Sequence, residues 1–575
     1  MLIDKVVLKG FRNFADATVN FAKNSLIIGA NNVGKTNLIY AIRLLLDKSL
    51  SDSEIEPLES DFHISTAGKI SDRLSVTIYF SDVTEDAVLA SLKGNVSDDA
   101  KFVLQYSASR RELTYDLKIG ATKSVISEIP SRYYLKHMNL RYVKSRRDLE
   151  KYISSEKRQL LKLSLDNRSE LESKSDYLQL SKIGKALEAI NDRIRNLHYV
   201  KGATDAVNEE LQKLAHDFSE YEVKLDSGAI QVQQFIDSLR LGASTSGASV
   251  MLGGDGRNNQ ILMALWKAKS QREHDPDSEV VFYCVEEPEA HLHPHQQRKL
   301  ADYLINDLPG QTLITSHSPQ ITARYKPDSI VHLKMRNGST KAASNGCSAC
   351  ISKAWDKLGY RMSILPAEAF FSKCVLLVEG PSEILFYSEL AKELSIDLDF
   401  YNISILSVDG IQFSVYVKIL DAMEIPWVLR TDNDVSDITV KKVLQRQLSG
   451  INRCRVSAGL LALPHLSVGT TAQSLIADGT WNTVSTEVNQ HGAYLSRVDL
   501  ENDLVEELGA EVIAFASKRT RNKLLDAAGA IKYLQGQKAI RMRGLIKEIS
   551  HHLVLLKTGN LAKPLLHAQL KAMTL

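Results

Sequence analysis

Two adjacent carboxylates at the end of an apolar run are the first residues in this sequence whose types could do chemistry. Residues 279–294 read EVVFYCVEEPEAHLHP. The apolar part, 280–285, predicts a buried parallel strand, because helices cover both faces of such a sheet. Glu286 and Glu287 would stand together at its tip, where two acids repel each other unless a cation lies between them. This pattern is typical of a nucleotide-hydrolysing site, and its alternative is a strand followed by an acidic turn.

A phosphate-binding loop is predicted near the N-terminus. Residues 29–36 read GANNVGKT, which fits G-x-x-x-x-G-K-T between a predicted strand and an amphipathic helix. The glycines let backbone N–H groups close around a β-phosphate, and the helix dipole favours the anion. Lys35 would reach the β- and γ-phosphates, and the Thr36 hydroxyl would bind Mg²⁺. The residues expected to bind the nucleotide here are Asn31, Asn32, Gly34, Lys35 and Thr36.

Two further segments could contact the same nucleotide. Residues 311–315 predict a strand that ends in Ser-His-Ser-Pro, where His317 could sense the γ-phosphate; on its own this would be a helix-capping loop. Residues 241–256 are small and Gly-rich. Their N–H groups, around Gly254 and Gly256, suit a second phosphate contact at a helix start, and the alternative is an ordinary linker.

A second set of acids follows strands in the other half of the chain. Residues 374–378 predict a strand with Glu379 at its tip, and Glu383 would lie one turn into the next helix. Residues 427–431 predict another strand, followed by Asp432 and Asp434. Because parallel strands end at one edge of a sheet, these acids should gather there. Clustered carboxylates bind Mg²⁺ or Mn²⁺, and two such ions about 4 Å apart can clamp both oxygens of a phosphodiester exchange.

The remaining composition limits the class of protein. A chain of 575 residues is long enough for several domains, and a formal charge of +2 neither requires nor excludes nucleic acid. Five cysteines, an odd number, favour a reducing cytoplasm over a disulfide framework. No apolar run is long enough for a membrane helix, so no membrane is expected. A region rich in Lys, Glu and Leu from 146 to 240 predicts inserted helices, interpreted as a dimerisation element.

The motifs NxxGKT, EEPEAHLHP and TSHSP, in this order, resemble the ABC-type ATPase half of the OLD (overcoming lysogenization defect) family, which is related to the ATPase heads of SMC proteins. The resemblance covers about residues 1–335. It implies that Glu286 holds Mg²⁺ through water and that Glu287 polarises the attacking water. Most ABC ATPases carry Asp at the first position. The Gly-rich loop departs further from the LSGGQ signature, which would act in trans on a partner subunit.

The string VEGPSE, followed about 50 residues later by a strand and DND, resembles the Toprim domain shared by topoisomerases, primases and OLD nucleases. This resemblance implies that Glu379, Glu383, Asp432 and Asp434 are catalytic metal ligands. A late acidic motif in such nucleases supplies further ligands, which transfers to Asp499 and Glu501; as acids at a helix N-terminus they would need no such function. A late lysine stabilises developing charge, and Lys563 is the choice by position.

The sequence therefore predicts an α/β protein with an ABC-type ATPase head, a helical insertion and a Toprim α/β domain. The expected parts are 1–145 and 241–345 for the ATPase, 146–240 for the insertion, and 365–575 for the Toprim nuclease with C-terminal helices. The protein is expected to bind and hydrolyse ATP and to cleave DNA with two divalent metal ions. Members of this family act in bacterial antiviral defence, in systems of the Gabija and retron types.

The expected assembly is a homodimer or a higher even oligomer, with a defence partner such as a helicase-like protein or a reverse transcriptase with its nucleic acid. One alternative is an SMC-like ATPase that tethers DNA without cutting it, against which the intact acids Glu379 and Asp432 argue. The other is a topoisomerase or primase; a topoisomerase needs a tyrosine nucleophile, for which Tyr494 is the one candidate.

Overall fold

The computed structural model describes residues 1–143, 149–214, 279–290, 292–347, 367–408, 413–440, 442–520 and 525–574, together with two short strands and isolated positions between 232 and 268. Contacts divide the chain into two units. The first comprises residues 1–144, 277–289 and 294–575, and the second comprises residues 145–276 and 290–293. In the described part of the chain, the search for a helix long and apolar enough to cross a membrane finds none.

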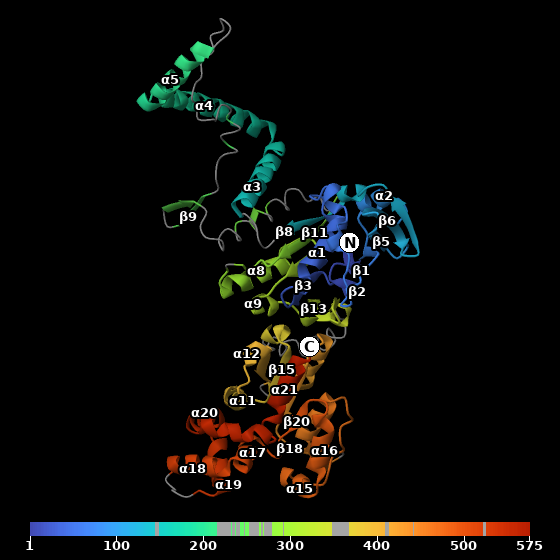
Figure 1. Cartoon of the computed structure of the whole chain (residues 1–575), viewed down its shortest axis with the longest axis vertical. Coiled ribbons are helices and arrows are strands. Elements are labelled where there is room, and N and C mark those ends of the chain that lie inside the picture. The colour runs from blue at the N-terminus through green and yellow to red at the C-terminus, as the bar shows by residue number, and fades with distance from the viewer. Residues whose placement is uncertain are drawn as a thin grey trace. The chain divides into compact units, whose positions relative to one another are not determined.

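The N-terminal part of the first unit contains two six-stranded sheets (Figure 1). One is antiparallel, in the order β2-β1-β4-β5-β6-β7. Its strands are β1 (Leu2–Phe11), β2 (Phe14–Asn20), β4 (Arg73–Ser81), β5 (Phe102–Ser109), β6 (Thr114–Thr122) and β7 (Val125–Ile129). Helix α2 (Asp86–Leu92) lies between β4 and β5 in the chain.

The other sheet is mostly parallel, in the order β14-β13-β3-β12-β11-β8. Its strands are β3 (Asn24–Gly29), β8 (Met138–Val143), β11 (Val280–Glu286), β12 (Thr312–Thr315), β13 (Ile330–Arg336) and the antiparallel edge strand β14 (Ser339–Ala342). Strands β3 and β11 flank β12 in parallel, so all three end at one edge of the sheet. Helices α8 (Pro294–Asn306) and α9 (Pro319–Thr322) belong to the same region.

Helix α1 (Lys35–Leu46) starts directly after the loop that follows β3. Its apolar face buries Leu38, Ile39 and Ile42 in the core shared with the antiparallel sheet. The helix begins at Gly34, whose φ of 100° is left-handed and whose Cβ position would lie 1.9 Å from the side-chain nitrogen of Asn13. Only glycine fits both conditions, so the loop is fixed in a shape that faces the end of the sheet.

The C-terminal part of the first unit is built on a four-stranded parallel sheet, in the order β16-β15-β17-β20. Its strands are β15 (Cys374–Val378), β16 (Ile403–Ser407), β17 (Trp427–Thr431) and β20 (Ala493–Leu495), and a hairpin follows β17 as β18 (Val435–Val440) and β19 (Val443–Leu448). The two predicted strands 374–378 and 427–431 are therefore present. Every residue of β15 and β17 is buried, as expected for strands covered on both faces.

Helices cover this sheet. Apolar side chains of α11, α17, α20 and α21 share one core with Cys374 and Leu376 of β15, and Figure 1 shows α21 beside β15. The helices of this part are α11 (Pro381–Glu393), α12 (Leu398–Tyr401), α13 (Phe413–Ala422), α14 (Ser449–Ser457), α15 (Ala472–Ala477), α16 (Thr480–Asn489), α17 (Leu500–Glu507), α18 (Gly509–Arg519), α19 (Ala527–Gln535), α20 (Lys538–Ile549) and α21 (Lys563–Met573).

Within the residues that the structure describes, the second unit contains three consecutive helices and a small hairpin. The elements are α3 (Leu149–Asp166), α4 (Glu170–Arg195), α5 (His198–Leu214), β9 (Gly242–Thr245) and β10 (Ala248–Met251). Helix α4 begins with a capping box in which Ser169 and Glu172 exchange hydrogen bonds. The sequence rightly predicts helices here, and the dimerising role remains a proposal. The overall α/β class is confirmed.

Candidate active sites

The first candidate site lies where β3, β11 and β12 end. The loop after β3, the acids after β11 and His317 after β12 meet because these strands run parallel in register, with Glu286 beside Thr315 and Thr315 beside Ile27. They surround a cavity of about 420 Å³. It is lined by Asn31, Asn32, Gly34, Lys35, Thr36, Asn37, Glu287 and His317. Seven of these eight were predicted from the sequence, and Asn37 was not.

Lys35 points into this loop. Its Nζ donates hydrogen bonds to the carbonyl oxygens of Gly29 at 2.9 Å and Ala30 at 3.0 Å. Burial lowers the pKa of Lys35 to about 8, although nearby carboxylates, Glu287 first among them, act in the opposite direction. An anionic phosphate in the cavity would stabilise the charged form of the amine. Lys35 is thus held close to where a phosphate would lie.

The acids after β11 are held by neutral donors. Glu286, 3% exposed, accepts a hydrogen bond from the Tyr142 hydroxyl at 2.8 Å, and its other oxygen is buried without a hydrogen-bond partner. Glu289 accepts from the Ser316 hydroxyl and the backbone N–H of His317, each at 2.7 Å. Burial raises the pKa of Glu289. The orphaned oxygen of Glu286 is a position that a Mg²⁺ shell would satisfy.

Glu287 projects from a strained backbone position beside His317. Its φ is +43°, a left-handed value that is rare for non-glycine residues. The His317 Nε2 lies 3.4 Å from Glu287 Oε1. Burial and the nearby Lys35 lower the pKa of His317, which favours the neutral imidazole at pH 7. The predicted signature-loop residues Gly254 and Gly256 lie outside the described residues.

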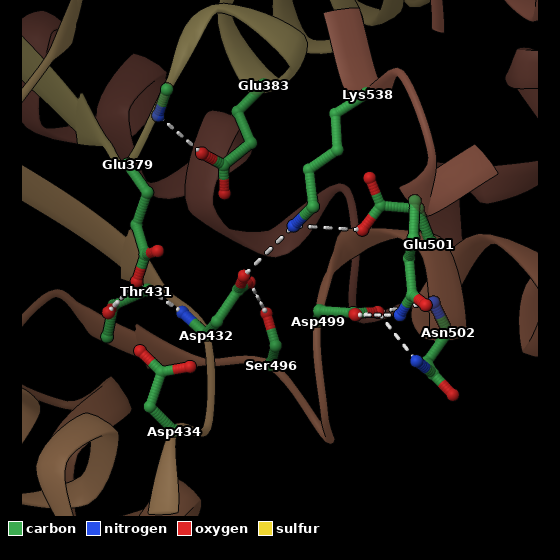
Figure 2. Close-up of polar contacts among 12 residues, drawn as sticks. Glu379, Glu383, Thr431, Asp432, Asp434, Ser496, Asp499, Glu501, Asn502 and Lys538 are labelled. Carbon is green, nitrogen blue, oxygen red and sulfur yellow. Dashed lines mark hydrogen bonds and ion pairs between the residues drawn. The ribbon is translucent and has the colours of Figure 1, made fainter. Parts of the chain in front are cut away.

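The second candidate site lies where β15, β17 and β20 end (Figure 2). Glu379 follows β15 and accepts hydrogen bonds from the Asp432 backbone N–H at 2.8 Å and from the Thr431 hydroxyl. Asp432 follows β17, is 9% exposed, and accepts from Ser496 at 3.4 Å. Burial, followed by the charges of Glu379 and Glu383, raises the pKa of Asp432 well above its usual value. The structure thus brings Glu379 and Asp432 together, as predicted.

Glu383 lies at the same edge of the sheet, where a backbone N–H and an arginine hold its carboxylate. One carboxylate oxygen accepts from the Gly380 N–H at 2.9 Å, which caps α11, and the other accepts from Arg430 at 3.1 Å. Arg430, on β17, also donates to Asp503 at 2.7 Å, and all three side chains are under 10% exposed. Burial raises the pKa of both Glu383 and Asp503. Arg430 and Asp503 were missed, because no local motif marks an arginine inside an apolar strand.

The late acids lie on the other side of Asp432, as Figure 2 shows. Asp499 is the N-cap of α17 and accepts from the Asn502 N–H at 2.8 Å and from Gln535 at 2.7 Å. Glu501 is 1% exposed, and among the described residues neither of its carboxylate oxygens has a hydrogen-bond partner. Asp499 therefore has the capping role that was its alternative explanation. A capping bond does not account for Glu501.

Lys538, the first residue of α20, supplies a cation to this cluster. Its Nζ lies 3.5 Å from Glu501 and 3.9 Å from Asp432. Burial alone would lower the pKa of Lys538, but the carboxylates of Glu501, Asp432 and Asp499 outweigh it and raise the pKa. The predicted lysine, Lys563, instead donates to Asn560 at 2.6 Å and lines a different cavity. The structure places Lys538 with the acids, and Lys563 apart from them.

The donor set at this edge suits a hard cation. It consists of carboxylates, it borders a cavity of about 330 Å³ lined by Asp432, Asp434 and Asp499 among others, and it includes the two orphaned oxygens of Glu501. Within the described residues, no three carboxylate, histidine or cysteine side chains already form a metal-binding group. The residues fit Mg²⁺ or Mn²⁺ by chemistry, and the side chains must rearrange to bind it.

Comparisons with known proteins match two domain families to this chain. The AAA ATPase domain family matches residues 1–128 and 98–322, and the overcoming lysogenization defect protein-like TOPRIM domain matches residues 370–434. The chain is 24% identical to the endonuclease GajA of Bacillus cereus (strain VD045) over 96% of each chain. It is 22% identical to the OLD nuclease of Thermus scotoductus over 76% of this chain and 82% of that one.

Among solved structures, an Smc head bound to the C-terminal winged-helix domain of ScpA is 18% identical, with a TM-score of 0.39, and covers 60% of this chain and 97% of that chain. The family matches span both candidate sites: the ATPase model includes the loop at Lys35 and the acids after β11, and the Toprim model includes Glu379 through Asp434. The chain therefore belongs to the OLD family of nucleases, with an AAA ATPase domain followed by an OLD-like Toprim domain.

Proposed function

We propose that this protein is an ATP-binding and hydrolysing endonuclease that cuts DNA phosphodiesters with Mg²⁺ or Mn²⁺ at the Toprim edge. One observation carries the proposal: Glu379, Asp432 and Glu501, from three separate segments, meet beside Lys538 at the carboxyl edge of one parallel sheet. The likeness to the endonuclease GajA along 96% of the chain supports it. Ligands in open α/β sheets bind at this kind of edge.

Each residue of the Toprim edge has a task in this proposal. When bound, divalent ions would polarise the phosphodiester and lower the pKa of the attacking water. Glu379, Asp432 and Asp434 would hold one ion, and Asp499 and Glu501 would hold a second. Lys538, in place of Lys563, would stabilise the negative charge that develops on the phosphate. Arg430 lies on β17 and pairs with Glu383, which follows β15 in the chain. This ion pair would keep the ends of the two strands at a fixed distance.

The ATPase site has a matching division of labour. Lys35 and the loop N–H groups would bind the β- and γ-phosphates, and Thr36 and Glu286 would hold Mg²⁺. Glu287 would orient the attacking water, with His317 3.4 Å away at the γ-phosphate side. We further propose that ATP-dependent association of two heads gates the nuclease. A role in antiphage defence, with a helicase-like protein or a reverse transcriptase as partner, belongs to the same proposal.

The test is cleavage of supercoiled plasmid with Mg²⁺ or Mn²⁺, with and without ATP, by wild type, Glu379→Ala and Lys35→Ala. We expect Glu379→Ala to abolish nicking while it still binds ATP. We expect Lys35→Ala to lose ATP binding and the response of cutting to ATP. Cutting that is equally fast in Glu379→Ala would overturn the proposed nuclease site. If wild type retains plasmid in a pull-down but leaves it intact under every metal, the DNA-tethering alternative holds.

A further inference from the structure

An arginine occupies part of the carboxylate cluster. Arg453, on α14, lies 3.2 Å from Glu379 Oε1 through Nη1, and its Nη2 pairs with the Asp434 carboxylate and donates to the Asp432 backbone carbonyl at 3.2 Å. The side chain is 10% exposed. One guanidinium thus joins the acid after β15 to the acid two positions beyond Asp432. These are two of the carboxylates proposed above as ligands of one ion.

The local fold builds this contact. Helix α14 begins directly against the loop of Asp432 and Asp434: the Gly450 N–H donates to the Asp434 carbonyl at 3.0 Å, and a Cβ at Gly450 would lie 2.1 Å from the Asp432 carbonyl oxygen. Glycine allows this approach, and Arg453 follows about one helical turn later. The arginine is therefore aimed at the acids by the start of its own helix.

Arg453 also has a cost that a neutral, purely structural partner would avoid. Its Nε is buried without a hydrogen-bond partner, and a buried unpaired donor is unfavourable. Glu379 Oε1 already accepts the Asp432 N–H and the Thr431 hydroxyl in addition to the guanidinium. A divalent ion held by Glu379 and Asp434 would therefore meet the guanidinium at Glu379 Oε1 and at the Asp434 carboxylate.

We propose that Arg453 is an internal competitor for the divalent ion: it offsets part of the negative charge of Glu379 and Asp434 before the ion binds and yields to the ion when it binds. This rests on the proposed metal-dependent nuclease. The guanidinium holds two like charges together in the free protein and weakens the affinity for the ion, so that the site fills at a higher metal concentration than it would without Arg453. Arg453 is a positioning residue that sets the metal affinity of the nuclease.

The experiment titrates full-length, nucleotide-free protein with Mn²⁺ by calorimetry. The variants are Arg453→Met, which removes the competing charge, Arg453→Lys, which keeps it, and Glu379→Gln, which identifies the heat that belongs to this site. Arg446→Met is the matched control, because Arg446 lines the same cavity but pairs with Asp437 at 2.9 Å. Thermal unfolding in EDTA and in Mn²⁺ is measured for each variant.

We expect Arg453→Met to bind Mn²⁺ about tenfold more tightly, in line with the loss of a charged hydrogen bond that the ion no longer has to break. We expect a lower unfolding temperature than wild type in EDTA and a larger gain on adding Mn²⁺, with Arg453→Lys and Arg446→Met near wild type. Unchanged or weaker binding in Arg453→Met overturns the inference while the nuclease proposal stands. Mn²⁺ binding that ignores Glu379→Gln in every background removes the metal site, and both proposals fail.

Discussion

The two acidic clusters of this chain are stabilised in different ways. At the ATPase edge, the buried carboxylates Glu286 and Glu289 accept hydrogen bonds from hydroxyl and backbone N–H groups. At the Toprim edge, cations act in addition to such neutral donors: Arg430, Arg453 and Lys538 pair with Glu383, Glu379 and Glu501 in turn. Both clusters stand at the carboxyl ends of parallel strands, so topology alone does not explain the difference.

The difference indicates where charge is supplied during the reaction. In the ATPase cavity, the positive charge of Lys35 is turned toward the loop carbonyls, and a nucleotide with its metal would bring charge of both signs. At the Toprim edge, the protein supplies its own cations, so a metal ion has to share or replace them. Substitutions that remove neutral hydrogen-bond donors should therefore affect the ATPase site most. Substitutions that remove positive charge should affect the Toprim site most.

The largest expected effect concerns Arg430, the buried cation beneath the Toprim edge. Arg430→Met leaves Glu383 and Asp503 buried without their shared charge. Breaking such a pair costs about 3–5 kcal/mol of unfolding free energy. Urea denaturation measures it. The exposed pair of Arg446 and Asp437 is the control, and Arg446→Met should cost less than about 1 kcal/mol. Equal costs for the two variants would show that the buried cation contributes no more to stability than a surface ion pair does.

Lys538 gives the next largest effect. Lys538→Ala should lower DNA cleavage by about 10²–10³-fold, because a positioned donor to developing charge is lost. Lys563→Ala is the matched control and should stay within about twofold, since Lys563 bonds to Asn560 away from the acids. The measurement is single-turnover nicking at saturating Mn²⁺. A reversed order, with Lys563 the more damaging site, would restore the assignment made by position in the sequence.

Tyr142 tests how much a neutral hydrogen-bond donor contributes at the ATPase edge. Tyr142→Phe removes the one hydroxyl that donates to Glu286 and leaves that carboxylate buried. We expect a loss of about 1–3 kcal/mol of stability and slower ATP hydrolysis, with plasmid cutting in the absence of ATP unchanged. The control is Tyr325→Phe, because the buried Tyr325 hydroxyl has no hydrogen-bond partner. That variant should be close to neutral, and a similar loss in both would show that the Glu286 contact is unimportant.

The sequence predicted the ATPase site more completely than the Toprim site. Lys35, Thr36 and Glu287 belong to short contiguous motifs, and the strand order of a parallel sheet brings those motifs together. Tyr142 was missed because it comes from β8, whose position beside β11 is a long-range pairing. The spacing of acids after apolar strands sufficed for Glu379 and Asp432, and it did not identify their cationic partners.

Lys538 lies on a helix that begins far from Glu379 and Asp432 in the chain. Arg453 follows Asp434 by 19 residues, across a hairpin, and no spacing rule connects either cation to the acids. Many lysines compete for a role that only packing decides, so position in the sequence favoured Lys563 over Lys538. Asp499 poses a different problem for sequence analysis, because this residue caps a helix and also lines the cavity beside the acids. Sequence patterns locate strand ends well, whereas the charge balance at those ends is a tertiary property.

The smallest expected effect is the uptake of a fraction of a proton by Lys35 when ATP binds. Its pKa is lowered from 10.5 to about 8, so the unfolded chain binds more protons than the folded one between these values, and this group's contribution to stability rises with pH there. A bound triphosphate favours the charged amine, so ATP binding at pH 8.5 should take up a fraction of a proton and weaken as pH rises further.

Calorimetry of ATP binding in two buffers of different ionisation enthalpy measures that uptake. Lys35→Arg is the matched control, because the guanidinium is already charged and should take up no proton at this position. His317 stays neutral in this range, since burial lowers its pKa further from pH 8.5. Equal uptake in wild type and Lys35→Arg would mean that Lys35 is charged before the nucleotide arrives. The ATPase site would then carry its own cation as the Toprim edge does, and the contrast between the two sites would be lost.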